Sequence, residues 1–320
     1  TTCSVLVLLP QGALAAHIGD SRIYRLRGNQ LHQLTFDHSL QWELRASGQL
    51  PPGSDIAASV PKNVITRSLG PNANVQIDLE GPFPIELGDV YLLCSDGLTG
   101  RVEDHELGPI MGALPPEEAA RVLVDLANLR GGPDNCTILI AKVVQPEMTT
   151  AVCQAPPITV GTAKGKTAVH PGLWIGAGVA ALGAIFLLMM SMTIPAAVVG
   201  GVALLMTGFG LIQHFGTSGG VALGAGRHLG KGPYTVTVCS PGSEFIGKLY
   251  EVIEDLREAA RDGHWNINWR TFDEYCNRAQ AAVEQKNYVE GVREFCRGVS
   301  FMMQELRSQG TRKSDSTIQY

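Results

Sequence analysis

Charged residues are scarce in this 320-residue sequence: Asp, Glu, Lys and Arg make up 17% of it, against about 25% in typical globular domains. Hydrophobic residues make up 45%, which excludes a largely disordered chain, because disorder requires low hydrophobicity. The formal net charge is −5. This lack of positive charge argues against nucleic acid as a partner. The length leaves room for about two domains.

The sequence also lacks any C-x-x-C pair among its seven cysteines. An odd, scattered set of cysteines indicates reduced thiols in a cytosolic setting rather than a disulfide framework or a zinc site. The first residue is Thr1 instead of Met, and it opens an alternating apolar stretch. We therefore expect the chain to be the tail of a longer protein.

No charged residue occurs between Lys166 and Arg227, a stretch of 60 residues. It contains two apolar runs, 172–190 and 196–214, joined by the turn 191–195. At 1.5 Å per residue each run is close to the ~30 Å thickness of a bilayer core. The pattern predicts two transmembrane helices. A buried hairpin in a soluble domain and a single tilted span with a re-entrant piece are the alternatives.

Positive charges flank this apolar region on both sides. Lys164 and Lys166 precede it, Arg227 and Lys231 follow it, and the turn between the runs carries no charge. The positive-inside rule then predicts a two-span membrane protein with its N-terminal and C-terminal parts in the cytoplasm. The lipid bilayer is accordingly an expected partner. Residues 144–171 and the Gly-rich residues 216–233 are predicted linkers.

The first 143 residues predict an α+β domain. Alternating apolar residues at 1–9, 13–19 and 21–28 are typical of antiparallel strands, and two more apolar strands are expected at 90–95 and 136–143. Helical spacing occurs at 39–46, 103–111 and 116–129. Strands mixed with a few helices indicate the α+β class.

Three aspartates stand next to predicted strands. Asp20 in IGDSR and Asp96 in LLCSDGL each follow a strand, and Asp134 in GGPDNCT precedes one. Carboxylates at strand ends can face a shared cleft, where they suit hard cations such as Mg²⁺ or Mn²⁺. Ordinary turn chemistry is the alternative for each of them, since Asp-Ser, Asp-Gly and Asp-Asn are favoured turn pairs.

Four blocks of sequence carry a family resemblance. They are IGDSRIYRLRGNQLHQLTFDHS (18–39), VITRSLG (64–70), GDVYLLCSDGL (88–98) and GGPDNCTILI (131–140). In this order they resemble the metal-dependent type 2C (PPM) protein serine/threonine phosphatases over roughly residues 1–143. The resemblance implies the C-terminal portion of an α/β/β/α sandwich of antiparallel sheets, with two or three Mg²⁺ or Mn²⁺ ions at its edge.

The same resemblance assigns roles to the three aspartates. Asp96 and Asp134 fall on the family's metal ligands, and Asp20 joins Asp96 at the additional metal of bacterial members. Ser21 and Arg22 would be supporting positions. The implied reaction is hydrolysis of phosphomonoesters on serine and threonine of cytoplasmic proteins by a metal-activated water.

Two parts of the family pattern are missing. The sequence contains D-G-x-x-G only at 96–100, within the block around Asp96; the family's earlier D-G-x-x-G block and its phosphate-binding Arg have no match here, and we expect them upstream. No catalytic residue beyond the metal ligands is therefore expected here, and this portion alone should be inactive. Residues 50–64 correspond to a mobile flap of bacterial members or to an ordinary connection.

Residues 243–308 predict three amphipathic helices. The last two weakly resemble a tetratricopeptide-type hairpin. A small helical bundle and a module that binds a protein partner are the two interpretations. The polar residues 309–320 are predicted to be a disordered tail.

Two functions of different classes follow. The first is a membrane-anchored protein phosphatase, and the second is a non-catalytic phosphatase-like sensor or scaffold with a partner-binding helical module. Retention of all three aspartates favours the enzyme, because such a cluster costs repulsion when no cation is bound. A transporter is disfavoured, since the two apolar runs contain no ionisable Asp, Glu, Lys or Arg.

Overall fold

The chain forms two compact units in the computed structural model, Thr1–Pro156 with His228–Tyr320, and Pro157–Arg227. The structure describes residues 1–50, 60–61, 64–72, 74–132, 134–150, 158–160, 171–215, 221–223 and 229–315. The first unit thus combines chain from before and after the apolar region. Most of the predicted flap 50–64 lies outside the described residues, as do much of the two predicted linkers and residues 316–320.

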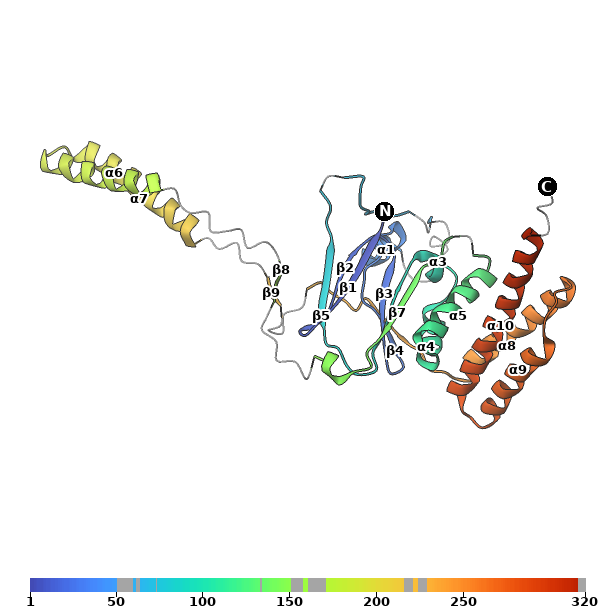
Figure 1. Cartoon of the computed structure of the whole chain (residues 1–320). Helices are drawn as coiled ribbons and strands as arrows, with labels where there is room; N and C mark the ends of the chain where they lie inside the picture. The colour runs from blue at the N-terminus through green and yellow to red at the C-terminus, as the bar shows by residue number, and fades with distance from the viewer. Residues whose placement is uncertain are drawn as a thin grey trace. The chain divides into compact units, whose positions relative to one another are not determined.

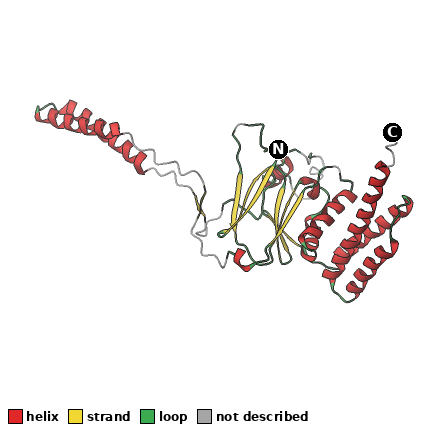
Figure 2. Ribbon diagram, viewed as in Figure 1, coloured by secondary structure: helices red, strands yellow, loops and turns green. Residues whose placement is uncertain are grey.

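Two antiparallel sheets form the centre of the first unit (Figure 2). The three-stranded sheet has the order β1-β2-β5, and the five-stranded sheet has the order β10-β4-β3-β6-β7. Their strands are β1 (Cys3–Leu9), β2 (Gly12–Ile18), β3 (Arg22–Arg27), β4 (Gln30–Gln33), β5 (Asp78–Phe83), β6 (Val90–Cys94), β7 (Ile138–Lys142) and β10 (Thr235–Val238). The five predicted strands correspond to β1, β2, β3, β6 and β7, so the expected α+β class is confirmed.

Strands β3 and β6 are buried on both faces. Because side chains alternate along a strand, Ile23 and Tyr91 belong to an apolar cluster with the three-stranded sheet, whereas Tyr24 and Leu92 belong to a larger cluster with the helices. This double burial explains why the sequence of β6 is almost continuously apolar.

In the described residues of the N-terminal part, the helices that accompany the sheets are α1 (Leu40–Ala46), α3 (Asp96–Thr99), α4 (Asp104–Ala113) and α5 (Pro116–Leu129). Local signals fix their starts. Ser39 caps α1 by accepting a hydrogen bond from the backbone N–H of Trp42, and Glu103 and Glu106 form a capping box at α4. Helices α4 and α5 lie against the five-stranded sheet (Figure 1).

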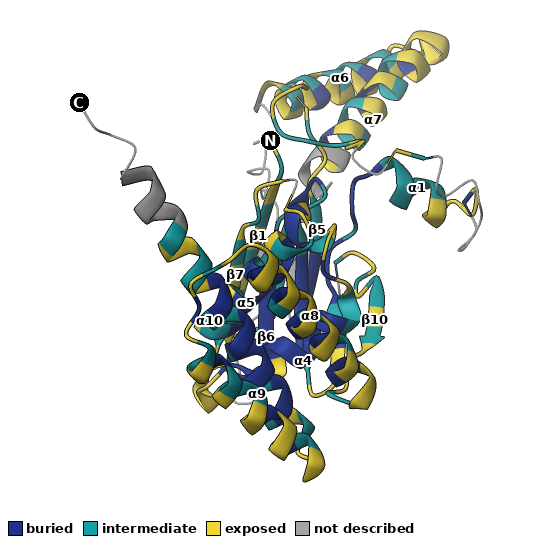
Figure 3. Ribbon diagram, turned by 90° about the vertical axis from the view of Figure 1, so that its right-hand side faces the viewer, coloured by how far each residue is buried: buried dark blue, intermediate teal, exposed yellow. Residues whose placement is uncertain are grey.

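The C-terminal segment packs on the outer side of α4 and α5. It consists of α8 (Ser243–Asp262), α9 (Trp269–Glu284) and α10 (Tyr288–Asp315). Helix α10 contacts both α4 and α5, and α8 and α9 pack on α10 (Figure 1). The large apolar cluster runs without interruption from the sheet into these helices, as the buried residues in Figure 3 show. The apolar faces that predicted a separate bundle or a partner-binding module therefore contact the rest of the same chain.

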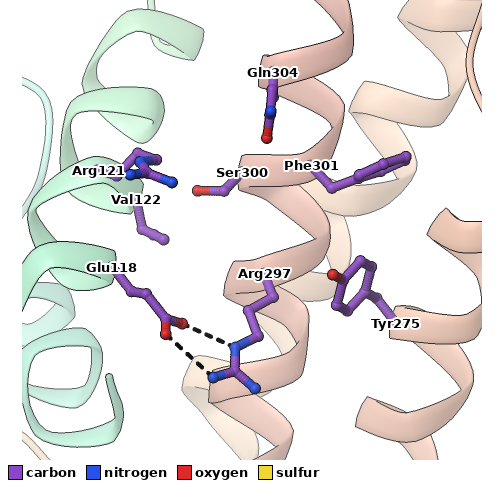
Figure 4. Close-up of a pocket in the computed structure, with 8 residues that line it drawn as sticks. All are labelled: Glu118, Arg121, Val122, Tyr275, Arg297, Ser300, Phe301 and Gln304. Carbon is purple, nitrogen blue, oxygen red and sulfur yellow. Dashed lines mark hydrogen bonds and ion pairs between the residues drawn. The ribbon is translucent and has the colours of Figure 1, made fainter. Parts of the chain in front are cut away.

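Polar contacts accompany this apolar interface. Arg297 of α10 donates from Nε and Nη2 to the carboxylate of Glu118 on α5, at 2.9 and 3.3 Å, beside a groove of 320 Å³ (Figure 4). Asp125 of α5 is fully buried, and it accepts hydrogen bonds from Ser300, at 3.1 Å, and from Arg307. Arg307 remains half-exposed.

The residues that follow the apolar region form hydrogen bonds with both sheets before the chain reaches α8. Glu80 of β5 is buried, and it accepts hydrogen bonds from the backbone N–H groups of Lys231 and Gly232 at 3.0 and 2.9 Å. Strand β10 then pairs with β4. Gly108 of α4 is required next to β10, since a Cβ there would lie 2.2 Å from the Cβ of Cys239.

The second unit contains α6 (Pro171–Met189), α7 (Thr193–Phe215) and a short ladder of β8 (Ile158–Val160) with β9 (Val221–Leu223). The segments Gly172–Met189 and Thr193–Leu211 are long and apolar enough to cross a membrane, with mean hydropathies of 2.1 and 1.9. Only 11% and 17% of their residues are buried, which argues against a hairpin buried in a soluble core. The second helix begins three residues before the predicted 196.

Helix α10 continues to Asp315. The sequence analysis expected a disordered tail from 309, but helical geometry extends into it. Residues 316–320 are outside the described part of the chain.

The buried carboxylate of Asp125 generates a first prediction. Arg307→Ala leaves this carboxylate with Ser300 as its remaining hydrogen-bond partner, so we expect it to lower the free energy of unfolding by about 2–3 kcal/mol. Arg270→Ala, on the exposed face of α9, is the matched control and should cost less than about 1 kcal/mol. Denaturant unfolding of the detergent-solubilised chain measures both, and equal costs would contradict the assignment.

A second prediction concerns the shared core. A chain that ends at Pro156 exposes the outer faces of α4 and α5 and leaves β4 as an open sheet edge, so we expect it to aggregate. The control is a chain in which a short flexible linker replaces residues 157–227, which also removes the apolar region but keeps α8–α10. This control should be soluble and monodisperse in size-exclusion chromatography. Comparable solubility of the two chains would show that the C-terminal helices are dispensable.

Candidate metal and phosphate site

The three aspartates singled out in the sequence line one cavity of 480 Å³ in the first unit. They come from segments that are 76 and 38 residues apart along the chain. The other lining residues are Arg22, Asp37, Gln41, Arg45, Gly97, Thr99, Gly100 and Arg101. The structure therefore brings together all three predicted ligands, Asp20, Asp96 and Asp134.

Sheet topology explains this meeting. Strands β3, β6 and β7 are neighbours, and Cys94 at the end of β6 pairs with Arg22 at the start of β3 and with Ile138 at the start of β7. The start of β3, the end of β6 and the start of β7 consequently lie at the same edge of the sheet. Asp20 precedes β3, Asp96 follows β6, and Asp134 precedes β7, so their carboxylates reach a common cavity.

Two buried histidines fix the backbone just before Asp20. His17 donates from Nε2 to the carbonyl of Gly19 at 2.8 Å, and the N–H of Gly19 donates to Nδ1 of His38 at 3.1 Å. His38 in turn contacts Asp78 through Nε2 at 2.9 Å. Burial and, to a smaller extent, the nearby His38 lower the pKa of His17 to about 4. His17 is therefore a neutral histidine of the core.

The electrostatics of the cavity favour a bound cation. Burial raises the pKa of Asp20, and repulsion from Asp96 and, to a smaller extent, Asp134 adds to that rise. Asp96 and Asp134 themselves are exposed. Divalent cations would relieve the repulsion between these carboxylates. Carboxylate oxygens are also the ligands that Mg²⁺ and Mn²⁺ prefer.

The three aspartates nevertheless do not form a closed metal site in which the protein supplies all the ligands. Across the described residues, no three His, Cys, Asp or Glu side chains converge closely enough to hold one ion together. Mg²⁺ usually keeps several waters and is bound by only one or two carboxylates. The three aspartates therefore suit ions that each contact one or two of them.

Arg22 and Asp37 form one wall of the cavity. Arg22 donates from Nε to both carboxylate oxygens of Asp37, at 2.8 and 3.1 Å, and its guanidinium lies 5.6 Å from the ring centre of Trp42. Arg22 also contacts the hydroxyl of Tyr24, which donates to Asp104 at 2.8 Å. Burial raises the pKa of Asp37 to about 6 even though Arg22 opposes that rise. Arg22 thus lines the cavity, and its supporting role stays a prediction.

Three further lining residues, Gln41, Arg45 and Arg101, were not expected from the sequence. Gln41 and Arg45 belong to α1, and Arg101 follows α3. Both helices start close to the aspartate motifs in the sequence. This proximity was the only sign in the sequence that their residues could line the cavity. Helical spacing alone does not show which face of α1 turns toward the cavity.

Comparison with known proteins gives the same result over the N-terminal part. No protein-family model matches the chain. The chain is 42% identical over 144 residues to "Protein phosphatase PhpP" of Streptococcus pneumoniae, an alignment that covers 45% of this chain and 58% of the relative. It is 37% identical over 143 residues to "Serine/threonine phosphatase stp" of Listeria welshimeri, which covers 44% and 56%.

Solved structures of such phosphatases also match. The serine/threonine phosphatase PstP/Ppp of Mycobacterium tuberculosis is 35% identical and covers 45% of this chain and 60% of its own, with a TM-score of 0.41. The phosphatase of S. agalactiae is 38% identical and covers 44% and 58%, with a TM-score of 0.40. Because these TM-scores are low, the sequence relationship carries the assignment.

The chain spans a little over half the length of the curated relatives that it matches. Within that span, the three motif aspartates occupy one cavity at the edge of an antiparallel sheet. The matched part of the chain is therefore similar to part of the type 2C (PPM) protein serine/threonine phosphatases.

Proposed function

We propose that the protein is a membrane-anchored, metal-dependent phosphatase that hydrolyses phosphomonoesters on serine and threonine of cytoplasmic proteins. One observation carries this proposal: Asp20, Asp96 and Asp134, from three separate segments, line a single open cavity. The names of the related proteins support the reaction type.

The residues of this chain would divide the work between binding and support. Asp96 and Asp134 would hold Mg²⁺ or Mn²⁺, and Asp20 would share an additional ion with Asp96. When bound, the ions supply the activation of a water and neutralise the negative oxygens of the phosphoryl group. Arg22 keeps the wall next to Asp20 in place through Asp37. The histidines around Gly19 set the position of the Asp20 backbone.

Membrane anchoring is the second part of the proposal. It is supported by the apolar segments of α6 and α7, whose residues are mostly unburied. Basic residues flank the apolar region on both sides. Both ends of the hairpin would then face the cytoplasm. The first unit is built from chain on both sides of the hairpin, which supports placing those two stretches in the same compartment.

The metal ligands give a third prediction. In the full-length protein, Asp96→Ala or Asp134→Ala should lower Mn²⁺-dependent hydrolysis of a phosphothreonine peptide by at least ~10², the loss expected for a main electrostatic contributor. Asp255→Ala, an exposed residue of α8, is the control and should retain full activity. Excess chelator should abolish hydrolysis by the unmodified protein.

Hydrolysis that persists in chelator would contradict a metal mechanism. Absence of any hydrolysis in the presence of Mn²⁺ and Mg²⁺, with a folded protein, would instead favour the non-catalytic sensor or scaffold.

Topology gives a fourth prediction. A protease-cleavable tag in the turn 191–195 should be cut from outside intact cells, whereas a tag at the C-terminus should be cut only after lysis. A carbonate wash should leave the protein in the membrane fraction. Cleavage of the C-terminal tag in intact cells would overturn the orientation, and release by carbonate would overturn insertion.

A further inference from the structure

Two arginines of the phosphatase-like portion have side chains without a partner among the residues that the structure describes. Among the described residues of 1–150, five arginines form ion pairs with Asp or Glu, and a sixth, Arg25, donates to the carbonyl of Pro84. Within that described part, Arg45 and Arg101 alone have side chains without a hydrogen bond or ion pair. Both side chains are exposed.

Both unpaired arginines line the candidate metal cavity. Arg45 is in the last turn of α1, and Arg101 comes directly after α3, so they approach the cavity from different elements. Neither forms an ion pair with Asp20, Asp96 or Asp134, although these carboxylates line the same cavity. Their guanidinium groups are consequently available to an incoming anion.

The two unpaired arginines lie in a part of the chain that has a net negative charge. Residues 1–166 contain 17 acidic and 12 basic residues, so the phosphatase portion as a whole repels anions. The two unpaired arginines offset part of this negative charge at the cavity, whose lining holds four aspartates and three arginines. Because both are exposed, they suit an anionic group that stays in solvent contact near the cavity, rather than a phosphate enclosed by metal ligands.

We infer that Arg45 and Arg101 select substrates in which acidic side chains flank the phosphorylated residue. This inference rests on the proposed phosphatase function and names its substrate class. The phosphoryl group would occupy the carboxylate-lined part of the cavity, while Asp or Glu residues of the substrate pair with the two guanidinium groups. Arginine suits this role, because its planar fork matches a carboxylate.

The test compares three substrates with the full-length protein in Mn²⁺. They are a phosphothreonine peptide flanked by Glu, the same peptide flanked by Ala, and p-nitrophenyl phosphate, which has no flanking residues. We expect the unmodified protein to prefer the Glu peptide through a lower KM. Arg45→Ala and Arg101→Ala should each raise KM for that peptide about two- to fivefold, and leave kcat unchanged. The preference should shrink at high salt, because exposed charges are screened.

Matched measurements separate the alternatives. Arg261→Ala, an exposed arginine of α8, should change nothing. An equal loss on all three substrates in the Arg45 and Arg101 variants would overturn the inference, since the arginines would then act on the phosphate itself. Hydrolysis without any preference for Glu would also overturn it, while leaving the phosphatase function intact. No hydrolysis of p-nitrophenyl phosphate by the unmodified protein would contradict the phosphatase function instead.

Discussion

Burial of α4 and α5 between a sheet and a second layer of helices is the constraint on which the first unit depends. One face of this helix pair contacts the sheet strands β3, β4 and β7, and the other face is covered by α10. The apolar cluster is therefore continuous from Tyr24 in the sheet to Phe295 and Met302 in α10. Burial of apolar area is the dominant favourable term in folding. The C-terminal helices are thus part of the core that supports the sheet edge where Asp20, Asp96 and Asp134 meet.

Sequence pattern predicted the elements whose periodicity is strong. Strands β1, β3 and β6 were placed because their apolar residues alternate or run continuously, and α5 because its apolar stripe follows Pro115 and Pro116. Strands β4, β5 and β10 were missed. Strand β4 has four residues, and β5 contains Gly81 and Pro82, which weaken the strand signal. Strand β10 is recognisable only through its partner β4, which lies some 200 residues away in the sequence.

The candidate site could likewise be predicted from the sequence only in part. Asp20, Asp96 and Asp134 stand in recognisable motifs at strand ends, and the register of β3, β6 and β7 is sufficient to bring them to one edge. The motifs did not predict which other side chains surround the aspartates at that edge. The bidentate contact of Arg22 with Asp37 and the approach of Arg45 depend on how the chain turns after β4 and on the position of α1. Such contacts arise from tertiary packing, which a local pattern does not encode. The same reason explains why the apolar faces of α8 and α10 were read as a separate module.

The chain leaves the first unit and returns to it close to β5, and this arrangement has a consequence for biosynthesis. Thr150 bonds to the backbone of Ile85, and Leu229 bonds to the backbone of Gly81, so the chain leaves and rejoins the first unit within a few residues of the same strand. A ribosome that has completed β7 must still make α6, α7 and all of α8–α10 before that unit can close. At about 5–20 residues per second this interval is on the order of ten seconds or more. Throughout it, the edge of β4 and the outer faces of α4 and α5 await their partners, so the nascent protein passes through a window in which chaperone binding would protect it from misassembly.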